Sequence, residues 1–174
     1  MTIDQDINIA VAIGPMLAVV VAMITVYYTN RNNRQQILVG KLEELFEIIQ
    51  TISRFYPIYK MLFPLVKQLL DPDIEEMRTF DDYKTSLDEE ISESERSQIF
   101  SYLSRIEVLA RCYTKGKMQE KILNFRTLMY SFTDFVVNAG GLQEAHLETG
   151  FPTFSAFQAQ LDDLKKDIIA QLKI

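Results

Sequence analysis

The chain has very few of the residues that build metal and redox centres, with one histidine and one cysteine in 174 residues. A metal centre needs several convergent ligands, and neither the H-E-x-x-H nor the E-x-x-H spacing is present. A lone cysteine forms no intramolecular disulfide, which agrees with a reducing compartment. We therefore expect no metal and no cofactor. We interpret His146 as a surface residue and Cys112 as a small core residue.

Glycine is also scarce, and the six glycines form no dinucleotide-binding, phosphate-loop or nucleophile-elbow motif. Asp162 and Asp163 are adjacent, so on a helix they would point about 100° apart rather than converge as an acid–base pair. No residue qualifies as a catalytic group. We expect a protein that is not an enzyme.

Positive charge is not clustered. The net charge is −6; residues 71–95 carry eleven acids and two bases, whereas residues 96–138 carry seven bases and three acids. Nucleic-acid binding requires lysine and arginine gathered on one surface. The sequence therefore argues against a DNA or RNA partner.

The chain does contain a long uncharged stretch, Ile7–Tyr28. At about 1.5 Å per residue it reaches roughly the 30 Å of a bilayer's hydrocarbon core. A signal peptide would have a basic leader, but the leader here is acidic. A buried helix of a soluble domain would show a polar face. We predict a short tail and a transmembrane anchor over residues 1–30.

Charges beside the stretch predict its orientation. Two acids precede it, whereas Arg31 and Arg34 follow it, so the C-terminal part should face the cytoplasm and the N-terminus the outside. Tyr27 and Tyr28 would lie at the inner headgroup level. We expect a single-pass protein of the cell (inner) membrane, with the lipid bilayer as a partner.

Small residues recur every four positions along the stretch, which gives one face that another helix could approach closely. They are Ala10, Gly14, Ala18 and Ala22. A homo-oligomer joined through this face is an alternative that the sequence leaves open.

Residues 31–174 predict an all-α cytoplasmic bundle of four to five helices. Residues 31–56 read as a stalk helix that continues the anchor and ends before Pro57. Its heptad-like stripe consists of Leu38, Leu42, Leu45, Ile49 and Ile52. Such a stripe needs a partner, either another helix of the same chain or a second copy, and we take the first as the default.

The next segments differ in character. Residues 55–70 predict a buried helix that is kinked at or started by Pro64, with Met61 on its apolar face. The alternative is an interfacial helix that rests on anionic lipid. Residues 71–95 read as an acidic connector with room for a short helix. Ser92 and Glu95 form a capping box that opens the next helix, and Ser155 is expected to cap the last one.

The leading functional hypothesis is a membrane-anchored, non-enzymatic interaction or regulatory module, an adaptor or accessory subunit whose protein partner is unknown. The alternative is a membrane effector of the toxin or defence type, whose oligomerised transmembrane helices perturb the bilayer.

Overall fold

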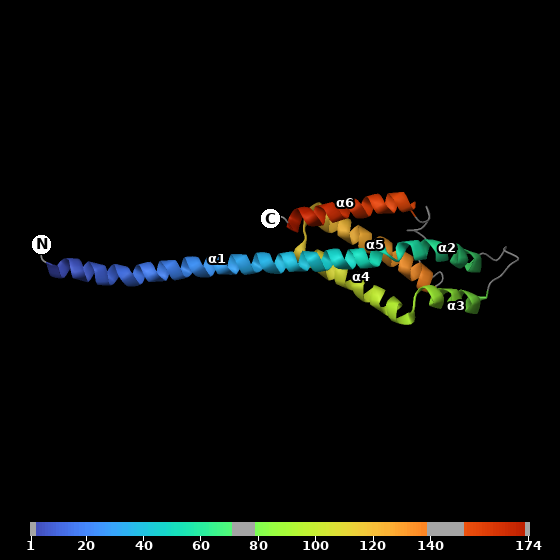
Figure 1. Cartoon of the computed structure of the whole chain (residues 1–174), viewed down its shortest axis with the longest axis horizontal. Helices are drawn as coiled ribbons and strands as arrows, with labels where there is room; N and C mark the ends of the chain where they lie inside the picture. The colour runs from blue at the N-terminus through green and yellow to red at the C-terminus, as the bar shows by residue number, and fades with distance from the viewer. Residues whose placement is uncertain (1–2, 71–78, 139–151, 173–174) are drawn as a thin grey trace. The chain divides into compact units, whose positions relative to one another are not determined.

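The computed structural model describes the backbone of residues 3–70, 79–138 and 152–172, and within these ranges it leaves out the side chains of residues 3–15 and 70. The described residues are helical with no strand, which confirms the all-α prediction. In chain order the helices are α1 (Ile3–Ser53), α2 (Tyr56–Leu70), α3 (Phe80–Glu90), α4 (Glu93–Tyr113), α5 (Gly116–Asn138) and α6 (Phe154–Leu172) (Figure 1).

The chain forms two units, Met1–Gly40 and Lys41–Ile174. Helix α1 continues without interruption from the uncharged stretch through the predicted stalk, and it ends at Ser53, before Pro57. The described residues of the first unit belong to α1 alone. The second unit contains the rest of α1 and the other five described helices, which confirms a helical bundle; α3 is the helix beyond the four to five that were predicted.

Side-chain caps begin three of these helices. The acidic segment, predicted to be mainly a connector, contains α3, whose capping box pairs Thr79 with Asp82. Residues 71–78 lie outside the described residues. The Ser92 capping box at the start of α4 is confirmed. For α6 the predicted cap is wrong: the Ala156 amide donates to the Thr153 hydroxyl at 3.3 Å, two residues before Ser155.

Helix α2 also differs from its prediction. It begins at Tyr56 and contains Pro64 in its interior, so the prediction that Pro64 starts it is wrong, and no observation tests the predicted kink. Tyr59 and Leu62 face the core, whereas Met61 is about half exposed. Tyrosine rings thus occupy the buried face on which the sequence placed methionine, because the position of the neighbouring helices decides which side of an apolar helix is covered.

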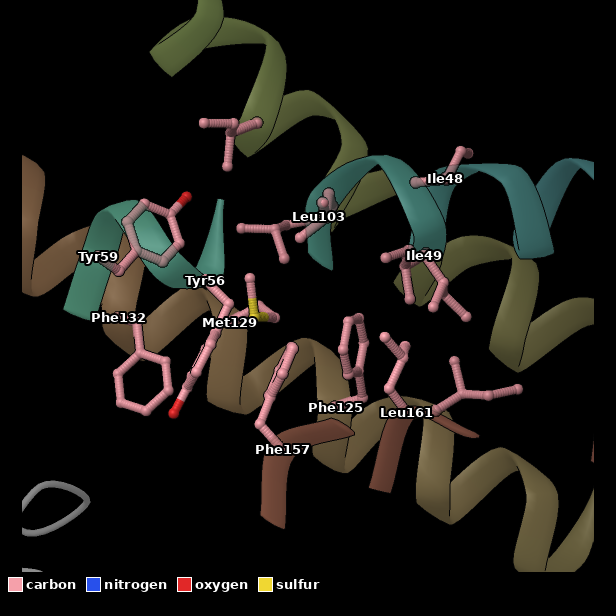
Figure 2. Close-up of a cluster of buried hydrophobic side chains, with 14 of the residues drawn as sticks. Ile48, Ile49, Tyr56, Tyr59, Leu103, Phe125, Met129, Phe132, Phe157 and Leu161 are labelled. Carbon is pink, nitrogen blue, oxygen red and sulfur yellow. The ribbon is translucent and has the colours of Figure 1, made fainter. Parts of the chain in front are cut away.

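The core of the second unit is built around aromatic rings. Tyr56 stacks on Phe157 with centroids 3.8 Å apart and an interplanar angle of 3°, and Phe125 and Phe132 pack beside them. Figure 2 shows α1, α2, α4, α5 and α6 contributing side chains to this cluster, with Met129 among the rings. Burial of one such large side chain contributes about 1.5–3 kcal/mol. The cluster therefore holds helices that are far apart in sequence.

Helix α4 runs antiparallel to the part of α1 in the second unit. Arg105 Nε donates to Glu44 Oε1 at 2.6 Å, and farther along α1 Thr51 shares a groove with Ser101, which comes earlier in α4. The C-terminal end of α4 therefore lies towards Lys41, the first residue of the unit.

Candidate functional site

The first candidate site is the apolar segment of α1. From Met16 to Val26 every described large apolar side chain is at least half exposed, and none belongs to the core cluster. Within the residues whose side chains are described, no helix has a stretch both long and apolar enough to cross a membrane. Residues 7–15, the first part of the predicted anchor, lie outside that set.

The predicted interface residues follow this segment on α1. Tyr27 and Tyr28 are exposed, and their rings meet edge to face with centroids 5.7 Å apart. Arg31 and Arg34 are exposed one and two turns later. Aromatic rings followed by guanidinium groups are typical of residues that lie at a lipid headgroup region.

The predicted helix-contact face is described only in part. Ala18 and Ala22 are exposed on α1, and the structure places no other helix of the first unit beside them. Ala10 and Gly14 lie outside the residues with described side chains. Their role in self-association stays a prediction.

The stalk stripe is divided between the two units. Leu42, Leu45, Ile49 and Ile52 are completely buried in the core of the second unit. Leu38 belongs to the first unit and is 37% exposed. The buried part of the stripe therefore meets its partners within the same chain.

A groove of about 370 Å³ lies between α1 and α4 in the second unit. Its lining includes Glu44, Glu47, Ile48, Tyr102 and Arg105. Hydrogen bonds from Arg105 and Lys41 lower the pKa of Glu44 to about 2, so this carboxylate stays charged at physiological pH. No ion pair within the described residues involves the Glu47 carboxylate.

A second groove, of about 350 Å³, lies between α5 and α6. Phe125, Leu128 and Leu164 line it together with polar residues. The Lys121 ammonium donates to both Asp163 Oδ2 at 2.7 Å and Asp167 Oδ2 at 2.6 Å. The two aspartates raise the pKa of Lys121, which keeps it charged. Each groove is thus lined by both charged and apolar side chains from two helices.

Three buried tyrosines have hydroxyl partners on distant segments. The Tyr59 and Thr133 hydroxyl oxygens are 2.8 Å apart, and the Tyr83 hydroxyl donates to the Val136 carbonyl near the end of α5. The Tyr56 hydroxyl donates to the Pro152 carbonyl. Burial raises the pKa of Tyr59 and Tyr83. These hydroxyls are satisfied within the fold and serve stability.

Of the two residues considered for redox or metal chemistry, the structure describes only Cys112. Cys112 is exposed at the end of α4, so its interpretation as a core residue is wrong. His146 lies outside the described residues. Within the described part, no group of three or more histidine, cysteine, aspartate or glutamate residues is placed to hold a metal ion.

Some contacts between surface side chains of the second unit could not be predicted from the sequence. The Glu44–Arg105 ion pair joins residues 61 positions apart, which no local pattern reveals. The bases around the α4–α5 turn did leave a signal, the excess of bases over acids in residues 96–138.

Comparison of the chain with protein-family models, curated proteins and solved structures found no match.

Proposed function

We propose that the chain is a membrane-anchored interaction module without enzymatic activity of its own. In this proposal the uncharged stretch of α1 is a single transmembrane span, and the second unit is a cytoplasmic docking platform for a protein partner. The chain acts as an adaptor or accessory subunit of a membrane assembly.

One observation supports this proposal above the others. The apolar side chains of residues 16–26 are exposed on α1, although the second unit has enough apolar residues to close a core of its own. A contiguous exposed apolar surface on a soluble protein is unfavourable in water and marks a contact with membrane or protein. The absence of charge from Ile7 to Tyr28 favours lipid as that contact.

A matched pair of substitutions tests the anchor. Val20 on α1 and Val108 on α4 are exposed to nearly the same extent, 51% and 49%. We expect Val20→Asp to release the full chain from membranes into the carbonate-washed supernatant, because a charge at the centre of a span costs about 3 kcal/mol on insertion scales. Val108→Asp should leave membrane association unchanged. Equal retention of both variants in the membrane pellet would contradict the anchor.

The native cysteine tests the orientation. A membrane-impermeant maleimide should not label Cys112 in intact cells but should label it after permeabilisation. A Thr2→Cys, Cys112→Ser variant should show the opposite pattern. Labelling of Cys112 in intact cells would place the second unit outside.

The effector proposal draws on a different observation, the exposure of Ala18 and Ala22 on α1. The stalk stripe gives less support to oligomerisation, because most of it is buried within the same chain and is not available to a second copy. Disulfide crosslinking in a Cys112→Ser background separates the two functions. Ala18→Cys should crosslink far more than Val20→Cys, about 200° away around the helix, if the small-residue face joins the spans. If both cysteine variants crosslink equally and weakly, and expression leaves the membrane potential unchanged, the results favour the interaction module over the effector.

A further inference from the structure

A group of bases surrounds the turn between α4 and α5. Residues 108–119 contain Arg111, Lys115 and Lys117 and no acid. All three side chains are exposed. Gly116 between the two lysines has a φ of 61°, in the left-handed region that glycine adopts without strain, which makes the turn tight. We call Arg111, Lys115 and Lys117 the basic turn.

These bases are only partly neutralised. Neither Lys115 nor Lys117 has an ion pair within the described residues. Arg111 contacts Glu107 at 3.0 Å, but Arg126 contacts the same carboxylate at 3.1 Å, so one acid serves two arginines. The next acid along α5 is Glu120. The turn therefore presents net positive charge to its surroundings.

Local helix energetics accounts for only one of the three bases. Arg111 lies in the last turn of α4, where a cation interacts favourably with the helix dipole. Lys117 lies in the first turn of α5, which contains no acid, and a cation there opposes the dipole. Lysine at position 117 is therefore not explained by the stability of its own helix.

The basic turn lies at one end of the second unit. Because α4 is antiparallel to α1, the chain from Arg105 to Tyr113 extends about 12 Å past the Glu44 ion pair, whereas Lys41 is only about 4.5 Å from Glu44 along α1. Figure 1 shows the α4–α5 turn, in yellow, at the same end of this unit as the last turn of α6.

The opposite end of α4 is acidic. Residues 88–95 contain five acids and no base, and α4 separates them from the basic turn by about 30 Å. The second unit thus has a basic end, at which its first residue Lys41 lies, and an acidic end. Lys41 is also the residue through which the second unit is joined along the chain to the proposed anchor.

We propose that the basic turn binds anionic phospholipid headgroups of the membrane in which α1 is anchored, and so holds the second unit against the bilayer. This inference rests on the proposed anchor. Anionic headgroups match the charge of the turn, and each lysine near such a surface increases binding about fivefold. The acidic end then faces away from the membrane.

The test uses the native cysteine as a reporter. The full chain is labelled at Cys112, the residue after Arg111, with a fluorescence donor and reconstituted into vesicles that carry an acceptor on a trace headgroup. One set of vesicles is neutral phosphatidylcholine, and the other includes phosphatidylglycerol. We expect stronger energy transfer with phosphatidylglycerol and a decline as salt is added.

Two double variants provide the comparison. Lys115→Gln with Lys117→Gln should reduce the ratio of docked to undocked protein about 25-fold in the anionic vesicles. Lys60→Gln with Lys67→Gln removes the same charge from exposed positions on α2 and should leave the ratio unchanged. Circular dichroism verifies that both variants keep the helical fold.

The outcomes distinguish this inference from the anchor. Equal energy transfer in neutral and anionic vesicles, or equal loss in both double variants, would overturn the role of the basic turn. Flotation of the same samples reports on the anchor. If the chain fails to float with neutral vesicles, the proposed anchor is wrong. In that case, flotation with anionic vesicles that requires Lys115 and Lys117 would still support lipid binding by the basic turn. Flotation with anionic vesicles that does not require these lysines would overturn lipid binding by the basic turn.

Discussion

Replacing Thr133 with valine removes a buried hydroxyl from the centre of the second unit. The Thr133 hydroxyl donates to the Met129 carbonyl at 2.8 Å and lies 2.8 Å from the Tyr59 hydroxyl oxygen. Both side chains are completely buried. A threonine hydroxyl has one proton, so while Thr133 donates to Met129 it accepts the proton of Tyr59.

The two single variants should therefore differ. Thr133→Val leaves the buried Tyr59 hydroxyl without an acceptor, and we expect a loss of about 1–3 kcal/mol in the free energy of unfolding. Tyr59→Phe leaves Thr133 with its carbonyl partner, so about 0.5–1.5 kcal/mol is expected. The double variant removes both hydroxyls and should lose less than the sum of the two. Each kcal/mol corresponds to a change of about 3–5 °C in Tm.

The assay is urea unfolding of the full chain followed by circular dichroism, with one detergent used throughout. Tyr102→Phe serves as the control, because Tyr102 is only partly buried and no hydrogen bond of its hydroxyl is found within the described residues. It should change the free energy by less than about 0.5 kcal/mol. A loss for Thr133→Val no larger than that for Tyr102→Phe would contradict the hydrogen bond between Tyr59 and Thr133, and so would two single losses that add without coupling.

Three further predictions concern pH and backbone. Because the pKa of Glu44 is lowered from 4.5 to about 2 in the folded chain, the free energy of unfolding should fall as pH decreases from about 4.5 to 2. Glu44→Gln should flatten that part of an acid-unfolding curve. An unchanged slope would contradict the ion-pair geometry. Burial raises the pKa of Tyr59 and Tyr83 above 10, so stability should decline as pH rises past 10, and Tyr83→Phe should weaken that decline in an alkaline titration. Gly116→Ala should destabilise the fold by about 1 kcal/mol in thermal unfolding, because the φ of Gly116 is positive. Gly40→Ala should be neutral or stabilising, because Gly40 lies inside α1 with open space where the added Cβ would be. A change of the same sign in both variants would contradict these two expectations.

The sequence by itself determined the features that depend on neighbours along the chain. The all-helical class, the uninterrupted α1 and the Ser92 cap of α4 follow from contacts between residues three or four positions apart. The uncharged stretch and the excess of bases in residues 96–138 are also properties of composition alone. These features predicted what the helices are and where the charge lies along the chain.

Only the tertiary structure decided how the helices use their faces. The hydroxyl of Tyr59 meets Thr133 across 74 residues, and that of Tyr83 meets Val136 across 53. Cys112 is exposed because α4 presents it to solvent. A helical pattern specifies an apolar side but not which neighbour covers it, since the angle and depth of packing depend on side chains from several helices at once. The same packing, through the antiparallel pairing of α4 with α1, places the basic turn at the same end of the second unit as Lys41.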